Sequence, residues 1–201
     1  MKYYALEGID NCGKSTIIKK LKEDFPNFNY VREPGTTIFA EQLRQVAFSN
    51  LNADPVAIQV ALLSARIDLS SQLLAKNQDT ISDRCYLSLA YVDGFEKEIC
   101  DKLLATNRLL VPLLPKKIIY LYVSPEESVK RFKNKTMEGY DTINVEDIKR
   151  RLARYDYLLD RVKELSISEV VRVNAERDFS LVYNDIKDIV YGEKRKTYCI
   201  S

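Results

Sequence analysis

The chain contains no histidine among its 201 residues, so any reaction mechanism that needs an imidazole is excluded. It is also poor in cysteine, because only Cys12, Cys85, Cys100 and Cys199 are present and no two form a C-x-x-C pair. This scatter argues against a zinc site or a disulfide framework. The chain has no large excess of charge of one sign either, since the formal net charge is +2. So small an imbalance predicts no groove for nucleic acid.

Long hydrophobic runs are absent as well. No apolar segment follows a basic start, and no run approaches the length of about 20 residues that crosses a membrane. We therefore expect no secretory signal and no membrane partner, and the unpaired cysteines suggest the reducing cytoplasm. With 46% hydrophobic and 30% charged residues, the chain can bury one core, so we expect a single domain over 1–201.

The sequence does contain a complete phosphate-binding loop. The pattern G-x-x-x-x-G-K-[ST] is matched by Gly8, Ile9, Asp10, Asn11, Cys12, Gly13, Lys14 and Ser15, and Thr16 follows directly. An apolar run at 3–6 precedes this loop and apolar residues at helical spacing follow it, so strand, loop and helix come in the required order. In this motif Lys14 reaches the β- and γ-phosphates and the Ser15 hydroxyl holds Mg²⁺. The loop predicts a site for a nucleoside triphosphate.

Strand and helix patterns alternate along the rest of the chain. Apolar runs predict strands at 28–31, 79–83, 117–123 and 170–173. Helical spacing predicts helices at 38–49, 55–74, 125–132, 145–165 and 179–191, with further helical segments up to about residue 110. In the 38–49 helix, we expect Phe39, Leu43, Val46 and Ala47 to face inward. The alternation predicts an α/β fold with a mostly parallel sheet and helices on both faces.

Two stretches lack a clear pattern. Residues 133–144 are polar and weakly periodic, so we expect a short mobile lid there. The tail at 192–201 is expected to be loosely held. Because the glycine loop opens this alternating pattern, the whole chain is predicted to have a three-layer fold of the P-loop NTPase type.

Three clusters indicate what receives the phosphoryl group. Arg32-Glu33-Pro34-Gly35-Thr36 ends the second predicted strand, Asp83-Arg84 ends the third, and Leu62 and Arg66 share one helix face. The carboxyl ends of parallel strands converge on the crevice that also holds the phosphate loop. We therefore expect Arg84 to bind a monophosphate opposite the γ-phosphate, and Asp83 to orient water on Mg²⁺. Considered alone, the Asp83-Arg84 pair fits a surface ion pair as well as it fits a binding site for phosphate and Mg²⁺.

Taken together, these residues resemble the thymidylate kinase family of nucleoside monophosphate kinases over nearly the whole chain. The resemblance is carried by Glu7-Gly8, Asp10, Arg32-Glu33-Pro34-Gly35-Thr36, Ser64-Ala65-Arg66, Asp83-Arg84, and the segments 88–91, 120–126 and 174–175. It implies that ATP and dTMP give ADP and dTDP, with Mg²⁺, in the synthesis of dTTP. It also implies a homodimer, for which the apolar helix around 58–74 is a candidate interface.

The same resemblance assigns roles to individual residues. It implies that Asp10 holds the sugar 3′-hydroxyl, Arg84 the acceptor phosphate and Arg66 the base. Glu33 and Pro34 are implied to form a cis peptide that shapes the acceptor pocket, to which the 88–91 segment contributes Tyr91. Asn174 and Ala175 are implied to lie near the adenine of ATP.

The cations at 131–135 bear on the subtype within the family. Some members carry an arginine inside the phosphate loop, whereas this chain has Asn11. The resemblance therefore implies that Arg131, Lys133 and Lys135 supply the catalytic charge from the lid, like an arginine finger in cis. Taken alone, Lys133 and Lys135 fit better as solvated charges, and Arg131 is also placed to stack on adenine.

The sequence departs from the family where the base is recognised. Leu62 stands in place of a base-stacking aromatic, Cys85 in place of a tyrosine, and Leu89 in place of a polar residue that contacts the base. The segment after Arg84 is also one residue short, and Ser88 is the candidate replacement for the polar contact. Because stacking contributes about 1–3 kcal/mol per base, thymidylate is the leading substrate and a different or broader set of deoxynucleotides the alternative.

Two other classes of function remain open from the residues alone. A deoxynucleoside kinase shares the phosphate loop but acts on an uncharged acceptor, and the 32–36 segment argues against it. A non-catalytic nucleotide-binding regulator is expected to lack Asp83, Arg84 or the lid cations, all of which are present.

Overall fold

The structure, a computed structural model, describes residues 1–50, 52–91, 96–133 and 145–192. Within this part, the strands form one sheet in the order β2-β3-β1-β4-β5, and all the pairings are parallel. The strands are β1 (Tyr3–Glu7), β2 (Asn29–Arg32), β3 (Thr80–Asp83), β4 (Lys117–Tyr122) and β5 (Glu169–Asn174). The prediction of an α/β fold around a parallel sheet is confirmed.

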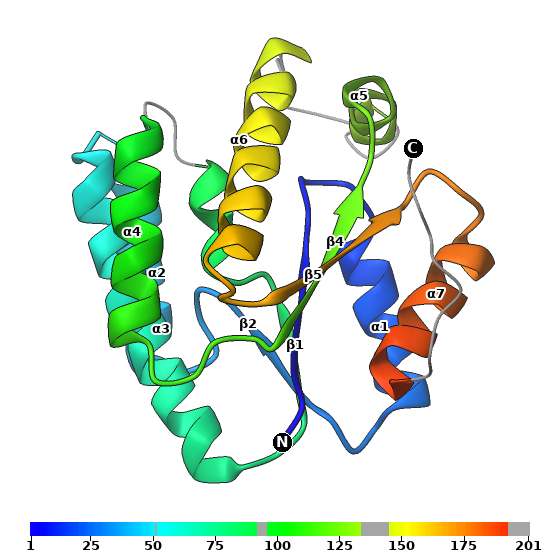
Figure 1. Cartoon of the computed structure of the whole chain (residues 1–201), viewed down its shortest axis with the longest axis horizontal. Coiled ribbons are helices and arrows are strands. Elements are labelled where there is room, and N and C mark those ends of the chain that lie inside the picture. The colour runs from blue at the N-terminus through cyan, green and yellow to red at the C-terminus, as the bar shows by residue number, and fades with distance from the viewer. Residues whose placement is uncertain (51, 92–95, 134–144, 193–201) are drawn as a thin grey trace.

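Helices cover both faces of this sheet, so the molecule has three layers (Figure 1). One face is covered by α1 (Lys14–Asp24) and α7 (Phe179–Tyr191). The other is covered by α3 (Pro55–Lys76), α4 (Lys97–Leu110) and α6 (Val145–Glu164), with α2 (Ile38–Ser49) packed on α3. The short helix α5 (Pro125–Lys133) lies beyond the carboxyl end of β4, and the 3₁₀ helix η1 (Tyr86–Tyr91) contacts α6.

Capping side chains explain where several helices begin. The Thr37 hydroxyl accepts a hydrogen bond from the Ala40 N–H at the start of α2. Asp54 and Asp178 accept hydrogen bonds from backbone N–H groups in the first turns of α3 and α7, and Pro55 is the first residue of α3. The predicted bounds of the helices at 38–49 and 179–191 are confirmed at both ends.

The apolar face of α2 differs from the prediction. Phe39 and Val46 were expected to face inward, but they are 50% and 56% exposed. The helix packs on α3 and buries the small residues Ala40 and Ala47 there. The expectation for Phe39 and Val46 is therefore wrong, because periodicity identifies an apolar stripe without showing which neighbour covers it.

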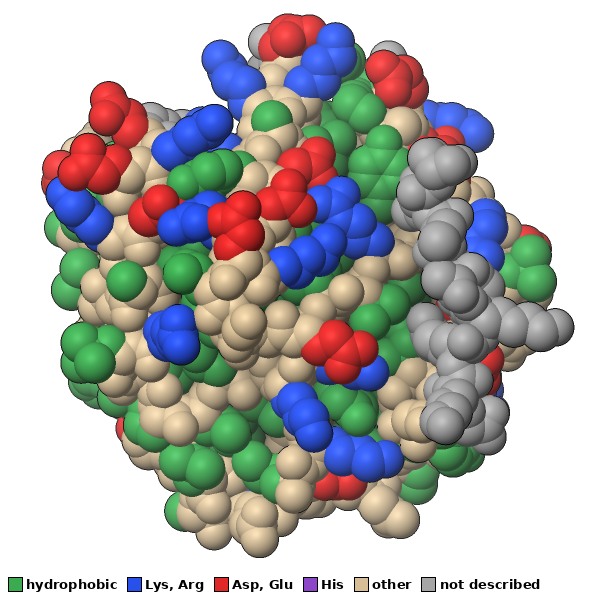
Figure 2. Space-filling model, in the orientation of Figure 1, with side chains coloured by type: hydrophobic (Ala, Val, Ile, Leu, Met, Phe, Trp, Pro, Cys, Tyr) green, Lys and Arg blue, Asp and Glu red, His purple; other side chains and the backbone are tan. Residues whose placement is uncertain are grey.

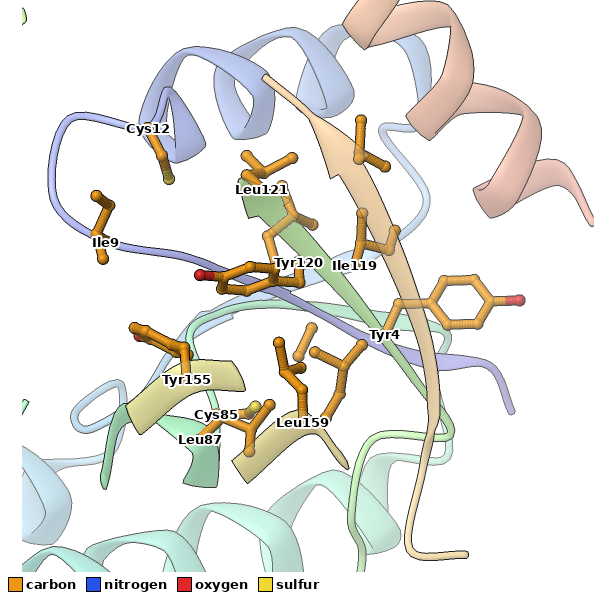
Figure 3. Close-up of a cluster of buried hydrophobic side chains, with 14 of the residues drawn as sticks. Tyr4, Ile9, Cys12, Cys85, Leu87, Ile119, Tyr120, Leu121, Tyr155 and Leu159 are labelled. Atoms are coloured by element: carbon orange, nitrogen blue, oxygen red, sulfur yellow. The ribbon is translucent and has the colours of Figure 1, made fainter. Parts of the chain in front are cut away.

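The core surrounds β1 and β4 and supports the strand ends. Leu6 is fully buried, and the rings of Tyr120 and Tyr155 pack with their centres 5.1 Å apart. Figure 3 shows this pair beside the residues Ile9 and Cys12, which belong to the phosphate loop. The loop therefore rests on tightly packed aromatic side chains.

Acidic and basic side chains are mixed on the face shown in Figure 2. Arg161 of α6 pairs with Asp101 of α4 at 2.9 Å, and Arg172 of β5 pairs with Asp156 at 2.7 Å. This mixture agrees with the near balance of charge in the sequence. Among the described residues, no helix combines the length and the apolar character needed to cross a membrane.

Candidate active site

The phosphate loop joins β1 to α1. Gly8 has a φ of 146°, and a Cβ there would lie 2.5 Å from the carbonyl oxygen of Leu121, so only glycine fits. Gly13 has a φ of 105° and stands directly before the first residue of α1. The side chains of Ser15 and Thr16 are exposed at this end of the helix. The loop and the helix N-terminus together form an arrangement that binds phosphate.

The Lys14 ammonium group is folded back over its own loop. Nζ donates hydrogen bonds to the carbonyl oxygens of Gly8 (2.7 Å) and Ile9 (2.9 Å), and lies 3.4 Å from Sγ of Cys12. Only 7% of the residue is exposed. A buried ammonium group needs acceptors, and phosphate oxygens can take the place of these carbonyls when a nucleotide binds.

The end of β3 lies next to this loop because β3 pairs with β1. The register places Asp83 opposite Leu6, and the Arg84 N–H donates to the Leu6 carbonyl at 2.9 Å. A polar pocket of about 200 Å³ is lined by Asp10, Asn11, Gly13, Lys14, Ser15, Thr16, Asp83 and Arg84. The predicted convergence of the third strand end with the phosphate loop is confirmed.

Asp83 brings an unpaired carboxylate oxygen to this pocket. Its Oδ1 is buried and has no hydrogen-bond partner within the described part of the chain. Burial raises the pKa of Asp83 above its ordinary value, although the charges of Lys14 and Arg84 oppose this shift. An orphaned carboxylate oxygen beside a phosphate loop is suited to an ordered water or to a hard cation.

Arg84 is held by its neighbours through one nitrogen of its guanidinium group. Its Nη2 donates to Oδ1 of Asp10 (2.6 Å) and to the Tyr91 hydroxyl (3.3 Å), and the guanidinium carbon lies 4.5 Å from the centre of the Tyr91 ring. Nη1 is buried without a hydrogen-bond partner among the described residues. Burial lowers the pKa of Arg84, but Tyr91 and Glu7 more than offset this, and the net pKa is raised. A charged guanidinium suits a second anion.

A second pocket, of about 430 Å³, adjoins the same loop. It is lined by Asn11, Cys12, Gly13, Thr16, Ile17, Arg131, Ala175, Arg177, Phe179 and Val182. The Arg131 guanidinium donates to the carbonyl oxygens of Cys12 (3.5 Å) and Ala175 (2.8 Å), and its Nε pairs with Glu127 at 2.7 Å. Arg131 therefore connects α5 to the phosphate loop and to the residue after β5.

The lining of this second pocket suits a flat, apolar base. The sequence predicts Arg131, Ala175 and Asn174 near the adenine, and the structure brings the first two to the pocket wall. The side chain of Asn174 instead accepts a hydrogen bond from the Glu176 N–H. Sequence reasoning missed Phe179 and Arg177, although both follow Asn174-Ala175 closely and could have been included on that ground.

Arg66 is buried in a polar cluster between α3, α4 and the end of β2. Its Nε donates to Glu33 at 2.6 Å and its Nη1 to Asn107 at 2.6 Å, while the Tyr3 hydroxyl donates to Glu33 at 2.9 Å. Glu33 and Arg66 are only 3% and 5% exposed. The Glu33–Pro34 peptide is cis, as the sequence led us to expect. Contact of Arg66 with a base stays a prediction.

Two further predicted acceptor residues, Ser88 and Tyr91, lie near Arg84. Ser88 donates its hydroxyl to Glu7 at 2.8 Å, and Tyr91 contacts Arg84. Leu62 is buried on α3, one turn before Arg66. Of the predicted lid at 133–144, residues 134–144, which include Lys135, lie outside the described residues. Lys133 is described only as the last residue of α5.

Comparison with known proteins identifies the family. The family model described as thymidylate kinase matches residues 6–186. A thymidylate kinase from Helicobacter pylori is 32% identical over 183 residues, which cover 85% of this chain and 92% of that protein. One from Aliarcobacter butzleri is 30% identical over 172 residues, covering 84% of this chain and 88% of that protein. The chain belongs to the thymidylate kinase family.

A solved structure agrees with the fold. The crystal structure of thymidylate kinase from Ehrlichia chaffeensis superposes with a TM-score of 0.65, covering 94% of this chain and 98% of that one at 18% identity. Family membership makes the protein a phosphotransferase of the nucleoside monophosphate kinase class. Two pockets that share Asn11, Gly13 and Thr16 of one phosphate loop are consistent with a donor and an acceptor that meet there.

Proposed function

We propose that this protein transfers the γ-phosphoryl group of ATP to dTMP and so produces dTDP for the synthesis of dTTP. The observation that carries the proposal is the position of Arg84, whose guanidinium group lines the same pocket as Lys14 and Asp83. A phosphate held by Arg84 would face a γ-phosphate held by Lys14. The reaction class needs this arrangement, because phosphoryl transfer depends on positioning and on stabilisation of charge.

The donor base is proposed to occupy the pocket between Arg131 and Phe179. Ala175 leaves space for a flat ring there, and the guanidinium of Arg131 supplies a cationic wall. Asp10, whose carboxylate now holds Arg84, is proposed to accept a hydrogen bond from the 3′-hydroxyl of the acceptor sugar. Leu62 and Ser88 would border the acceptor base.

Mg²⁺ is the cofactor that this reaction implies, and the residues present fit it. The exposed Ser15 hydroxyl and the unpaired Oδ1 of Asp83 line one pocket, and both are hard oxygen donors. We propose that Ser15 would hold the ion directly and Asp83 through water. The ion, when bound, neutralises charge on the phosphate oxygens.

The working form is proposed to be a cytoplasmic homodimer. The described cysteines Cys12, Cys85 and Cys100 are free thiols, which suits a reducing compartment. Apolar side chains are exposed on α2, and Val60 of α3 is 50% exposed. We propose that α2 and the outer face of α3 form the interface.

Turnover of a panel of nucleoside monophosphates, with ATP and Mg²⁺, tests the proposed function. We expect dTMP to have the highest kcat/KM, and thymidine to be inactive. Preference for another deoxynucleotide would assign the second candidate, a kinase of different or broader base specificity, which the leucine at position 62 favours. Turnover of thymidine but not of dTMP would instead indicate a deoxynucleoside kinase.

A further inference from the structure

Glu7 is a fully buried carboxylate at the last position of β1, directly before the phosphate loop. A charge in such a place is costly unless hydrogen bonds or an opposite charge compensate it. Sequence reasoning gave this residue no role. Its neighbours show what it connects.

Four hydrogen bonds from separate segments end on the Glu7 carboxylate. Oε1 accepts from the Cys85 N–H and the Ser88 hydroxyl, each at 2.8 Å. Oε2 accepts from the Gly8 N–H at 3.1 Å and from the Tyr155 hydroxyl at 2.8 Å. Each oxygen thus has two donors, which fills the usual capacity of a carboxylate. The phosphate loop, the segment after Arg84, η1 and α6 are joined at this one group.

The Glu7 carboxylate also lies behind the acceptor-binding arginine. Nη1 of Arg84 is 4.0 Å from Oε2 of Glu7, beyond hydrogen-bond distance but close enough for charge attraction. The backbone of Arg84 has a φ of 72°, which is unusual for a residue with a side chain. The bond from the Cys85 N–H to Glu7 holds the chain immediately after this turn.

Tyr155 extends the cluster to α6, the helix that follows the predicted lid at 133–144. Its ring is fully buried, and Figure 3 shows it beside Tyr120 and near Cys85. Burial and the adjacent Glu7 charge raise the pKa of Tyr155, so the hydroxyl remains a donor. Movement of α6 relative to β1 would therefore act directly on the group that supports Arg84.

We propose that Glu7 is a positioning residue, which fixes the guanidinium of Arg84 relative to the phosphate loop and which Tyr155 links to α6. The inference deepens the proposed function and rests on it, since it assumes that Arg84 binds the acceptor phosphate. A buried ion network with only a structural role would change stability without changing acceptor kinetics selectively.

The first test compares two tyrosine hydroxyls that are equally buried. Tyr155→Phe removes one hydrogen bond to Glu7, and Tyr86→Phe removes a bond of 2.9 Å to Ser168. Ser168 also donates to the carbonyl of Pro115, which places this control near the start of β4, at the opposite end of the strand from the phosphate loop. Each substitution is expected to lower Tm by a similar amount.

The kinetic outcomes separate the two roles. Tyr155→Phe is expected to lower kcat/KM for dTMP about tenfold, the size of one hydrogen bond to a charged group, with the Kd for ATP unchanged. Tyr86→Phe is expected to leave both values within about twofold of wild type. Equal kinetics for the two variants, or equal weakening of ATP and dTMP binding in Tyr155→Phe, would overturn the proposal.

The second test asks whether Glu7 acts through Arg84. Glu7→Gln keeps the shape of the side chain but removes the charge and one pair of acceptor positions. In the wild-type background, Glu7→Gln should weaken dTMP binding, measured by calorimetry, at least about tenfold. In an Arg84→Lys background, the same substitution should weaken dTMP binding by a further factor of less than about three. Additive effects would show that Glu7 does not work through Arg84. If Glu7→Gln does not fold, Tyr155→Phe is measured in the same two backgrounds.

These results are distinguishable from failure of the proposed function. Wild-type turnover is measured first with the panel of monophosphates, and the variants are then assayed with the acceptor that the panel selects. A wild type active on dTMP whose Tyr155→Phe variant behaves like Tyr86→Phe refutes the role of Glu7 alone. A wild type inactive on all monophosphates refutes both.

Discussion

At the scale of single residues, the site contains charged side chains whose hydrogen-bonding capacity is not filled by oppositely charged groups. The ammonium of Lys14 is bonded to loop carbonyls, while Arg84 and Asp83 each have a buried polar atom without a hydrogen-bond partner among the described residues. Burying polar atoms without hydrogen bonds lowers the stability of the folded protein, and binding of a ligand to these atoms explains why they are present.

Lys14→Ala is expected to lower kcat by orders of magnitude while the protein stays folded. The substitution removes a charge-assisted hydrogen bond to phosphate, which strengthens in the transition state. Steady-state kinetics with ATP and dTMP measures the effect, and circular dichroism checks the fold. A variant that keeps more than about a tenth of wild-type kcat, or 1.4 kcal/mol, would show that this loop is not the ATP site.

Arg84→Ala should damage the acceptor site selectively. Because Arg84 lines the pocket beside Lys14 and is the proposed ligand of the acceptor phosphate, we expect KM for dTMP to rise about a hundredfold, in line with the removal of a charge-assisted bond pair. The Kd for ATP, measured separately by calorimetry, should change little. Equal weakening of ATP and dTMP would mean that Arg84 serves the donor or the fold.

Asp83→Asn is expected to abolish most activity and yet to raise Tm at neutral pH. Burial raises the pKa of Asp83, so the folded state loses stability as the pH rises from the ordinary aspartate pKa to the raised one, and the loss is complete above the raised pKa. At acidic pH, below the ordinary aspartate pKa of about 3.9, the carboxyl is neutral in both states and the gain vanishes. Thermal unfolding of both proteins across this pH range measures the difference, and a gain that does not depend on pH would contradict the explanation.

At the scale of elements, α5 brings Arg131, the proposed donor-side cation, to the phosphate loop. Glu127 holds Nε of Arg131, and this leaves the other guanidinium nitrogens to reach Cys12 and Ala175. The helix therefore orients Arg131 toward the phosphate loop through contacts within the chain itself.

Replacing Arg131, Lys133 and Lys135 together by alanine tests the lid cations. If they neutralise the transferred charge, kcat should fall more than KM rises for either substrate, by up to roughly 10³-fold. Lys130→Ala is the matched control, since Lys130 lies on the same helix, 71% exposed, and pairs only loosely with Glu127 at 3.4 Å. The idea fails if the triple variant keeps kcat within about threefold, under 0.7 kcal/mol.

At the scale of the whole molecule, several of the exposed large apolar side chains are concentrated on α2. On α2, Ile38 is 82%, Phe39 50%, Val46 56% and Phe48 51% exposed. Several large apolar residues exposed together on one helix indicate an interaction surface. This is the observation behind the proposed dimer.

Phe39→Glu combined with Val46→Glu is expected to convert a dimer into a monomer. Buried charges in an apolar interface are strongly unfavourable, whereas the isolated chain already exposes both positions to water. Light scattering over a range of concentrations measures the mass. Leu109→Glu is the control, because Leu109 is 82% exposed at the end of α4. A wild type that is monomeric at every concentration would refute the proposal.

Much of this protein follows from local sequence. The pattern from Gly8 to Thr16, the capping residues Thr37 and Asp178, and the apolar spacing of each segment act within a few residues, so the elements and most of their bounds could be predicted. The phosphate loop could be recognised for the same reason, because its chemistry is set by nine consecutive residues.

Only the tertiary structure decided how distant segments meet. Pairing of β3 with β1 brings Arg84 to the phosphate loop, and packing of α6 brings Tyr155 to Glu7, 148 positions away. The burial of Glu33 with Arg66 and the exposure of Phe39 likewise depend on which element covers which face. Local periodicity predicts on which face of a helix or strand a side chain lies. Which other element covers that face depends on the packing of the whole chain.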